Sequence, residues 1–564
     1  MSLVGALNVS KTALAVHQAA LQVTTNNIAN AGNPDYTRQT ATVTPSAEAQ
    51  LRPGMRMGTG INLSAIQRQI DDALEGRIRA SISDREGAGA EAQWLGRVEA
   101  VFNELGDDDL STHLSTFFNG WSNLANDPDN ASFRQIVLRS GETLAGVFRD
   151  VRGQLGNMRR DVDGRMKSLT NDANSIADQI AGLNQQIAIA EGGQGPSANG
   201  LRDQRDTLLK VLSGLIDVTS VEMPGGMVNV LVGSEPLVIG TVNRGIVLEQ
   251  KSVDGELTAE VRSATDNALL PVTSGQLGAL VGVRAELSGV IDKVDDLAGN
   301  LIFELNKLHA EGQGLEGLTK ASGTAIVADT TAALNSSAAD LNFTPKNGTF
   351  DVMIRQPGGV VKTTRIHVDL DGIGTDTSLD SLRADLDAID GISATIVGGR
   401  LSIKSDSATV QFSFKEDQSG TLAALGINTF FSGSDAMDIA VSNDLKGNVN
   451  LLAAAVNGQA GDNTNARRIA ELERKSIQGL NGGTLKDSYA AIIDGVAVSA
   501  AGSRTSAEAA QTVSQTLLAQ REALSGVSLD EEAINLMRQQ RAFQGAARVV
   551  AAIDELMKTL LSLV

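Results

Sequence analysis

Residues 529–564 read LDEEAINLMRQQRAFQGAARVVAAIDELMKTLLSLV. In the second half of this stretch apolar residues alternate at spacings of four and three, which places them in one stripe along a helix. A second apolar row repeats every seven residues on another side of the same helix. Acidic residues crowd the first turn, where the helix dipole favours negative charge. The stretch therefore predicts one helix, about 54 Å long, with two apolar faces.

A capping box is expected to start this helix. Ser528 and Glu531 have the spacing of the Ser-x-x-Glu pattern, in which the hydroxyl accepts from an amide three residues on and the carboxylate returns to the serine amide. The helix is thus expected to begin at Leu529.

The first thirty residues show a similar pattern. Leu or Ile recurs every seven residues from position 7 to 28, and valines form a second row almost opposite. Lys11 is the only charged residue before Asp35, whereas an exposed helix face normally carries several charges. We therefore predict that both terminal helices pack against neighbouring subunits; an intramolecular bundle core is the alternative. The predicted apolar interface comprises Leu7, Leu14, Leu21, Ile28, Leu529, Leu536, Phe543, Val549, Ile553, Leu556, Leu560 and Leu563.

Composition limits the class of protein. At 564 residues the chain is too long for one core, which predicts two to four domains. Its net charge of -20 disfavours nucleic acid and anionic membranes as partners. The absence of cysteine excludes disulfides and thiolate chemistry. Neither a cleaved secretion signal nor an apolar run of ~18 residues is found. These rules alone indicate a cytoplasmic protein, but they do not detect uncleaved export signals.

The spacing of apolar residues predicts helices on either side of β-rich segments. Helical periodicity extends over 66–145, with breaks near 106 and 126, and over 155–187 in a coiled-coil manner. Apolar residues alternate among Gly and Asp turns over about 218–262, which predicts a small antiparallel sheet. Helical spacing returns over 287–308 and 465–524, whereas 319–450 is rich in Gly, Ser, Thr and Asp and contains strand-like runs.

The expected fold class is mainly α with a β insertion, with long terminal and central coiled-coil-like helices. Three domains are expected. Residues 1–60 with 525–564 would form a terminal helical assembly domain. Residues 61–318 with 451–524 would form a helical bundle that carries the small sheet, and 319–450 would form an inserted β-rich outer domain.

Four motifs resemble one family. Asn26-Asn27-Ile28-Ala29-Asn30, followed by Pro34-x-Tyr36-x-Arg38, is similar to the N-terminal motif of flagellar rod, hook and hook-associated proteins. The stretch SGVSLDEEA at 525–533 resembles the C-terminal motif of hook-associated members. LRDQRD at 201–206, and GDN at 461–463 leading to DSYA at 487–490, point to the same members. Residues 319–450 show no specific match.

The turn after the first helix departs from the family pattern at two positions. Asn33 and Asp35 stand where Thr and Gly are common, which leaves the geometry of this turn open. Gly32 is expected to end the helix in the left-handed conformation, and Pro34 cannot continue it.

The resemblance implies a structural protein that the flagellar type III apparatus exports unfolded, located outside the cell in the flagellum between hook and filament. Its implied partners are copies of itself in a ring, the hook protein, the next hook-associated protein and an export chaperone on the C-terminal helix; no nucleic acid and no membrane insertion are expected. Through the motif, Asn30 and Tyr36 join the predicted interface. A hook or distal-rod subunit and a secreted coiled-coil adhesin are the alternatives.

Metal and cofactor sites have little support in the sequence. The four histidines have no second ligand at metal-site spacing; they are His17, His113, His309 and His367. Residues 369–380 hint at a calcium loop, but Ile373 occupies a ligand position, so a solvated turn is preferred.

Catalysis has no better support. Acidic pairs alone give a glycosidase almost no basis, and Trp94 and Trp121 are expected in the core rather than as sugar platforms. The chain is therefore expected not to be an enzyme, with no catalytic residues, no metal and no cofactor.

Overall fold

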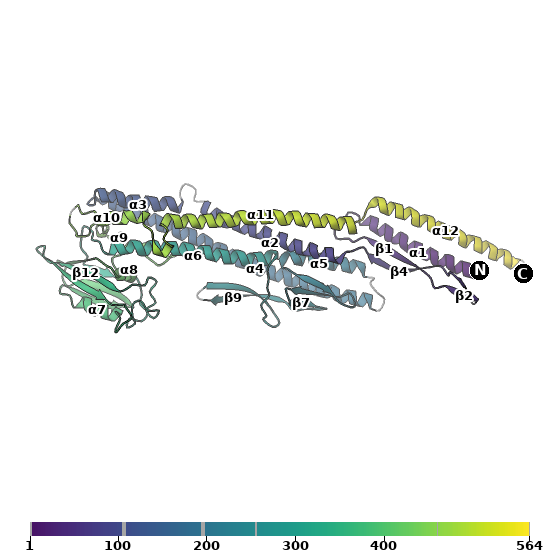
Figure 1. Ribbon diagram of the computed structural model, residues 1–564, viewed down its shortest axis with the longest axis horizontal. Coiled ribbons are helices and arrows are strands. Elements are labelled where there is room, and N and C mark those ends of the chain that lie inside the picture. Colours follow the sequence, from purple (N-terminus) through teal and green to yellow (C-terminus); the bar gives the residue numbers. More distant parts are fainter. Residues whose placement is uncertain are drawn as a thin grey trace. The chain divides into compact units, whose positions relative to one another are not determined.

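The computed structural model describes residues 3–52, 54–103, 109–192, 198–253, 256–459 and 461–562. Long helices dominate it, and its sheets are small and antiparallel (Figure 1). The fold class, mainly α with β insertions, is confirmed. Among the described residues, no helix combines the length and the apolar character that crossing a membrane requires.

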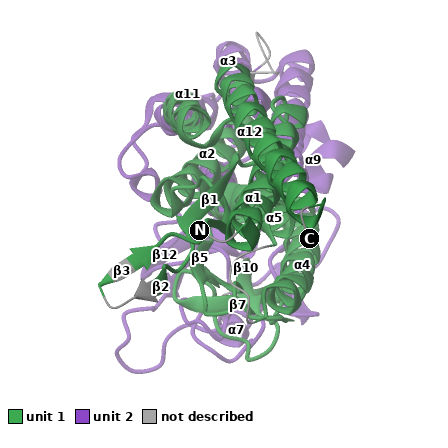
Figure 2. Cartoon of the chain, turned by 90° about the vertical axis from the view of Figure 1, so that its right-hand side faces the viewer, with its two compact units in different colours: residues 1–94, 162–284, 501–564 green, residues 95–161, 285–500 purple. Residues whose placement is uncertain are grey.

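The chain divides into two compact units (Figure 2). Unit 1 consists of 1–94, 162–284 and 501–564, and unit 2 of 95–161 and 285–500. The division cuts four long helices, each of which contributes to both units. These are α2 (Asp72–Asn103), α4 (Ala131–Glu191), α6 (Gly275–Ala310) and α11 (Leu485–Ser525). The expected three-domain arrangement stays a prediction.

The two chain ends pair within unit 1. Helix α1 (Leu3–Ala29) lies against α12 (Leu529–Ser562), and the N- and C-terminal ends are adjacent (Figure 1). Strands β1 (Gln39–Pro45) and β4 (Ile61–Arg68) pair antiparallel and also contact α1. Both the C-terminal helix and its start at Leu529 were predicted.

Packing of α1 uses the valine row. Val16, Ala20, Val23 and Asn27 are buried at spacings of four and three, which defines the face turned into unit 1. Because α12 and the β1–β4 ladder both contact α1, the chain itself supplies partners on two sides of this helix. The seven-residue leucine row borders that face and is partly buried.

The rest of unit 1 contains helices, a four-stranded sheet and two hairpins, and it includes the antiparallel sheet predicted near 218–262. Its buried apolar residues come from both strand and helix faces, such as Val230, Val232, Leu209 and Leu212. The elements are β2 (Ala49–Arg52), β3 (Met55–Met57), α5 (Asn199–Leu215), the four-stranded sheet of β5 (Thr219–Glu222), β6 (Val228–Val232), β7 (Glu235–Ile239) and β8 (Val242–Asn243), and the hairpin of β9 (Ile246–Val253) and β10 (Glu256–Ser263).

Unit 2 holds the β-rich segment that was predicted, with its own hydrophobic core. Two three-stranded sheets and α7 enclose this core. The strands are β11 (Lys320–Ser322), β12 (Gly348–Arg355), β13 (Val361–Val368), β14 (Ile392–Val397), β15 (Arg400–Ser405) and β16 (Gln411–Lys415) in the orders β11-β15-β14 and β13-β12-β16, with the pair β17 (Phe431–Ser432) and β18 (Ala440–Val441). The helices are α3 (Leu110–Asn126), α7 (Leu379–Asp387), α8 (Thr421–Leu425), α9 (Asn443–Gly447) and α10 (Thr464–Glu471).

Both tryptophans belong to the core, as predicted. Trp94 is 9% exposed and Trp121 is fully buried. The Trp121 ring lies edge-on to Phe117, with 6.4 Å between the ring centroids, and tilted against Phe430 at 5.8 Å. Such aromatic contacts anchor the core of unit 2.

Three local predictions were wrong. Ile66 does not begin a helix but lies in β4, whose partner strand precedes it by some twenty residues. Helix α4 continues without a break from Ala131 to Glu191. The helical periodicity of the sequence is weak near residue 150, but the apolar positions on both sides of it stay buried. Gly32 is not left-handed; the turn is closed instead by amide hydrogen bonds from Asn33 to Asn30 and from Tyr36 to Asn33.

Candidate assembly site at the chain ends

A buried carboxylate joins the two terminal motifs. Glu532, in the first turn of α12, is only 2% exposed. Arg38 donates to its Oε1 from Nε at 2.9 Å, and the Arg38 Nη2 lies 2.7 Å from the same oxygen. Asn27 donates from Nδ2 to Oε2 at 3.1 Å. We call Asn27, Arg38 and Glu532 the terminal clasp; it holds the end of α1, the start of β1 and the start of α12 together.

Asn27 also fixes the turn between α1 and β1. Its carboxamide accepts from the Gln39 amide at 3.0 Å and donates to the Gln39 carbonyl at 2.9 Å, which imitates a strand partner. The Tyr36 hydroxyl donates to the Asn27 Oδ1 at 2.7 Å. Burial, followed by the negative charge of Asp203, raises the pKa of Tyr36 to about 12, so the phenol keeps the proton that it donates.

A second charged contact ties this turn to α11. Arg521 donates from Nη1 to the carbonyl of Pro34 at 2.8 Å and from Nε to Glu75 at 2.7 Å. Lys210 of α5 lies 3.0 Å from the other oxygen of Glu75. Burial acts to raise the pKa of Glu75, but Lys210 and Arg521 outweigh it and hold the pKa below its usual value. The carboxylate is therefore charged at neutral pH.

The start of α12 differs from the predicted capping box. The Glu531 amide reaches the Ser528 hydroxyl only at 3.4 Å. The Glu531 carboxylate contacts Arg38 at 2.8 Å, so Arg38 binds the carboxylate that the capping box would return to the Ser528 amide. The Arg38 amide in turn donates to the Ser525 carbonyl at 3.0 Å.

The interior LRDQRD motif supports the same region. Arg68, at the end of β4, donates to Asp203 at 2.9 Å and to Asp206 at 2.6 Å. Arg202 pairs with the buried Glu191 at 2.8 Å, and Arg205 donates to the Gly226 carbonyl at 2.6 Å. The motif therefore connects α5 with β4, with the end of α4 and with the loop before β6.

The second interior motif has a structural role in unit 2. Asp462 accepts from the amides of Val456 and Asn457 at 3.0 Å each. Asn463 donates to the Ala125 carbonyl at 2.6 Å, which ties the loop to the end of α3. Tyr489 is buried, with 2% of its surface exposed.

The predicted interface positions on α12 separate into two groups. Leu536 and Phe543 are partly buried and Ile553 is 6% exposed, on the side of α12 that carries Glu532. On the same side Gln539 is bonded to His17 of α1 at 2.8 Å. The second group, which we call the outer stripe, is Val549, Leu556 and Leu560, which are 48%, 55% and 50% exposed.

The remaining predicted positions are less exposed. Leu529 is the exception, at 56% exposed. Leu563 lies outside the described residues. The others are partly buried, namely Leu7, Leu14, Leu21, Ile28, Asn30 and Tyr36.

The outer stripe is free of charge along its length. With about 100° of rotation per residue, Val549, Leu556 and Leu560 share one side of α12 with the small residues Gly545 and Ala552. The charged residues of this half project elsewhere on the helix; they are Arg548, Asp554, Glu555 and Lys558. A free helix end would normally carry charge on its most exposed side.

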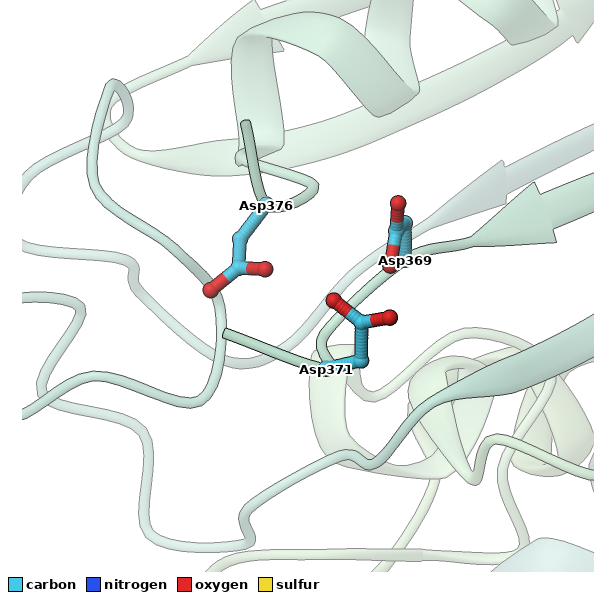
Figure 3. Close-up of side chains that lie close together, drawn as sticks. All are labelled: Asp369, Asp371 and Asp376. Carbon is cyan, nitrogen blue, oxygen red and sulfur yellow. The ribbon is translucent and has the colours of Figure 1, made fainter. Parts of the chain in front are cut away.

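The acidic loop in the β-rich segment was considered as a calcium site. Carboxylate oxygens of Asp369, Asp371 and Asp376 lie within 4.8 Å of one another (Figure 3). Asp376 accepts from the Gly372 amide at 3.0 Å and Asp371 from the Ile373 amide at 2.8 Å. Two of these carboxylates are therefore already used to shape the loop, as expected for a solvated turn.

Sequence reasoning found the motifs but not their contacts. It listed Asn27, Arg38 and Glu532 within motifs without assigning them partners, and it did not single out Arg521 or Glu75. The terminal clasp joins residues separated by 494 and 505 positions, so spacing carries no sign of it. The signal that could have indicated a buried partner is the position of Glu532, an acid on the same helix face as the apolar Leu536 and Phe543.

Comparison with protein families gives two matches. The family model "Flagellar hook-associated protein FlgK helical domain" matches residues 95–326. The model "Flagellar basal body rod FlgEFG protein C-terminal" matches residues 520–563, which contain α12.

Full-length relatives carry one name, "Flagellar hook-associated protein 1". The protein from Salmonella typhimurium is 26% identical over 574 residues and covers 99% of each chain. The one from Escherichia coli is 26% identical over 583 residues with the same coverage, and the one from Bacillus subtilis is 27% identical over 561 residues, covering 98% of this chain and 96% of its own.

A solved structure has a similar fold. It is described as the structure of the flagellar hook junction protein FlgK from Burkholderia pseudomallei, and it aligns with a TM-score of 0.50 at 17% identity. The alignment covers 80% of this chain and all of the other.

Proposed function

Because this chain belongs to the flagellar hook-associated protein 1 family, we propose that it is a structural subunit of the bacterial flagellum that forms the junction between hook and filament. Its activity would be assembly, not catalysis. The single observation that carries the proposal is the outer stripe of α12, an uncharged apolar surface left exposed after α12 has packed on α1.

The energy available from the outer stripe is appropriate for assembly. Complete burial of one such side chain contributes about 1.5–3 kcal/mol, and Val549, Leu556 and Leu560 are each about half exposed. Covering all three would therefore contribute roughly 2–4 kcal/mol per subunit. Each contact is weak alone, so a stable junction requires many subunits that contact one another at once.

The partners in this proposal are further copies of the chain in a ring, the hook protein on one side and the next hook-associated protein on the other. Residues 1–60 with 525–564 form the assembling domain, 61–318 with 451–524 the helical bundle, and 319–450 the outer domain. The terminal interface consists of the predicted positions, with the outer stripe contacting neighbours. The chain reaches the flagellum, outside the cell, through the flagellar type III apparatus, and a chaperone covers the C-terminal helix beforehand.

The first test removes α12. Cells that produce only residues 1–524 are examined by electron microscopy, and flagellin is measured in the medium. Bare hooks with flagellin released into the medium are the expected result. Intact filaments and normal swimming would contradict the proposal and favour a secreted adhesin.

A point variant separates assembly from folding. Leu556→Asp places a carboxylate in the outer stripe, where burial against a neighbour would be costly; because Leu556 is 55% exposed in the single chain, the melting temperature of the monomer should be unchanged. Glu555→Gln, on the charged side of the same turn, is the matched control. Normal filaments on Leu556→Asp would remove the outer stripe from the interface.

A further inference from the structure

A polar groove in unit 1 is not used by the terminal clasp. It has a volume of about 910 Å³ and lies between the turn after α1 and the helices α4 and α5. Its walls are rich in carboxamides, including those of Asn26, Asn30, Gln186 and Gln204, and Asp35 adds a negative charge. We call it the carboxamide groove. Carboxamides both donate and accept, so they suit the backbone of an extended segment.

The carboxamide groove has open space beside α4. Gly182 lines the groove in the middle of α4, where glycine is less favourable than alanine. A methyl group at position 182 would have no atom within 4 Å beyond its own helix turns. The groove therefore has room beside Gly182, where an added side chain would narrow it.

The β2–β3 hairpin is a second, independent feature of unit 1, and it has no packing layer among the described elements. Strands β2 and β3 pair only with each other among the described strands, and no helix makes broad contact with either. A two-stranded hairpin without a supporting layer is marginally stable in water. Arg56 in β3 is 74% exposed, and within the described part of the chain it has one ion pair, at 4.0 Å, with the exposed Glu48.

The hairpin cannot fill the groove of its own chain. The residues at its base lie beside the N-terminal half of α1, since Gly60 approaches Val9 and Thr12, and β2 lies toward the N-terminal end of α1 (Figure 1). The groove is at the other end of α1, beside Asn26 and Asn30. Fourteen residues of helix separate the two, about 20 Å.

We propose that the β2–β3 hairpin of one copy occupies the carboxamide groove of a second copy. The occupant is a two-stranded segment that carries an exposed arginine, Arg56, and the groove offers carboxamides and the exposed Asp35, so the charges of the two surfaces are complementary. The two surfaces differ, so the contact is head-to-tail, and copies joined in this way are offset along α1 by about 20 Å. This contact rests on the proposed function, because it assumes that copies of the chain assemble. It adds the offset between neighbouring copies along α1, which the outer stripe does not define.

Thiol cross-linking tests the contact directly, because the chain has no cysteine. Arg56→Cys and Gln204→Cys are combined in one full-length chain and treated in cells with a short bis-maleimide. Covalent dimers and higher multimers are expected. Arg56→Cys with Gln515→Cys, an exposed position on α11, is the control pair and should give monomers.

Filling the groove gives a second measurement. Gly182→Leu in the cross-linking background should abolish the multimers. The Cβ of the new side chain meets no atom within 4 Å, so the chain should still fold, and the melting temperature of the monomer checks this. Absence of multimers from the Arg56–Gln204 pair overturns the hairpin contact whether or not filaments form. Filaments, scored on the same cells, report on the proposed function alone.

Discussion

Removing Arg38 tests whether the terminal clasp holds α12 in place. Arg38→Met keeps much of the side-chain volume but leaves the Glu532 carboxylate, 2% exposed, with Asn27 as its one remaining side-chain partner among the described residues. Breaking a buried ion pair in this way costs about 3–5 kcal/mol. The exposed contact of Arg38 with Glu531, whose side chain is 61% exposed, adds at most ~1 kcal/mol.

The effect should be local to the chain ends. Hydrogen exchange of the α12 amides measures the free energy of opening this helix from α1. A loss of 3–5 kcal/mol corresponds to exchange that is faster by about two to four orders of magnitude. Amides in the β-rich segment of unit 2 should exchange at an unchanged rate.

Two further variants serve as controls for Arg38→Met. Arg56→Met removes an arginine whose ion pair is exposed and 4.0 Å long, and it should leave α12 exchange unaltered. In Arg38→Met with Glu532→Leu no charge is left buried, so most of the loss should be recovered. If Arg38→Met accelerates α12 exchange no more than Arg56→Met does, the terminal clasp does not hold the helix.

Two predictions concern pH. Because the pKa of Glu75 is held below its usual value by Lys210 and Arg521, this carboxylate stabilises the fold above its unfolded pKa, and the stabilisation is lost as the pH falls through its folded pKa. Urea titrations of Glu75→Gln should therefore show lower stability at pH 7 and a shallower decline below about pH 4.5. Burial lowers the pKa of His309 to about 4, so protonation of the unfolded chain removes about 3 kcal/mol of stability between about pH 6.5 and 4. In urea unfolding, His309→Gln should remove most of the pH dependence of stability over this range, whereas His367→Gln, at an exposed position, should retain it. An unchanged pH dependence in His309→Gln would contradict the role given to His309.

Periodicity was sufficient to predict the long helices, since apolar spacing is a local property of the sequence. It gave the start of α12, its two apolar faces and the β-rich segment. It did not give the pairing of β1 with β4, because register depends on a partner strand that local patterns do not specify. It interrupted α4 near residue 150, where Gly146 and Gly153 weaken the local signal but burial of Phe148 and Val151 maintains the helix.

The candidate site was predicted less completely than the fold. The outer stripe is exposed and Ile553 is buried because of the way α12 is rotated about its own axis relative to α1. The sequence pattern contains two apolar rows and does not determine which of them faces α1. The ion pairs of Arg38 and Arg521 depend on tertiary proximity alone. No sequence spacing assigns either arginine to its acid.

The terminal clasp also sets an order in time. Asn27 and Glu532 are separated by 505 positions, and synthesis proceeds at about 5–20 residues per second. Helix α1 is therefore complete for roughly 25–100 s before its partner exists. During that interval its valine row, which ends up against the rest of unit 1, is available to whatever other molecule binds it first.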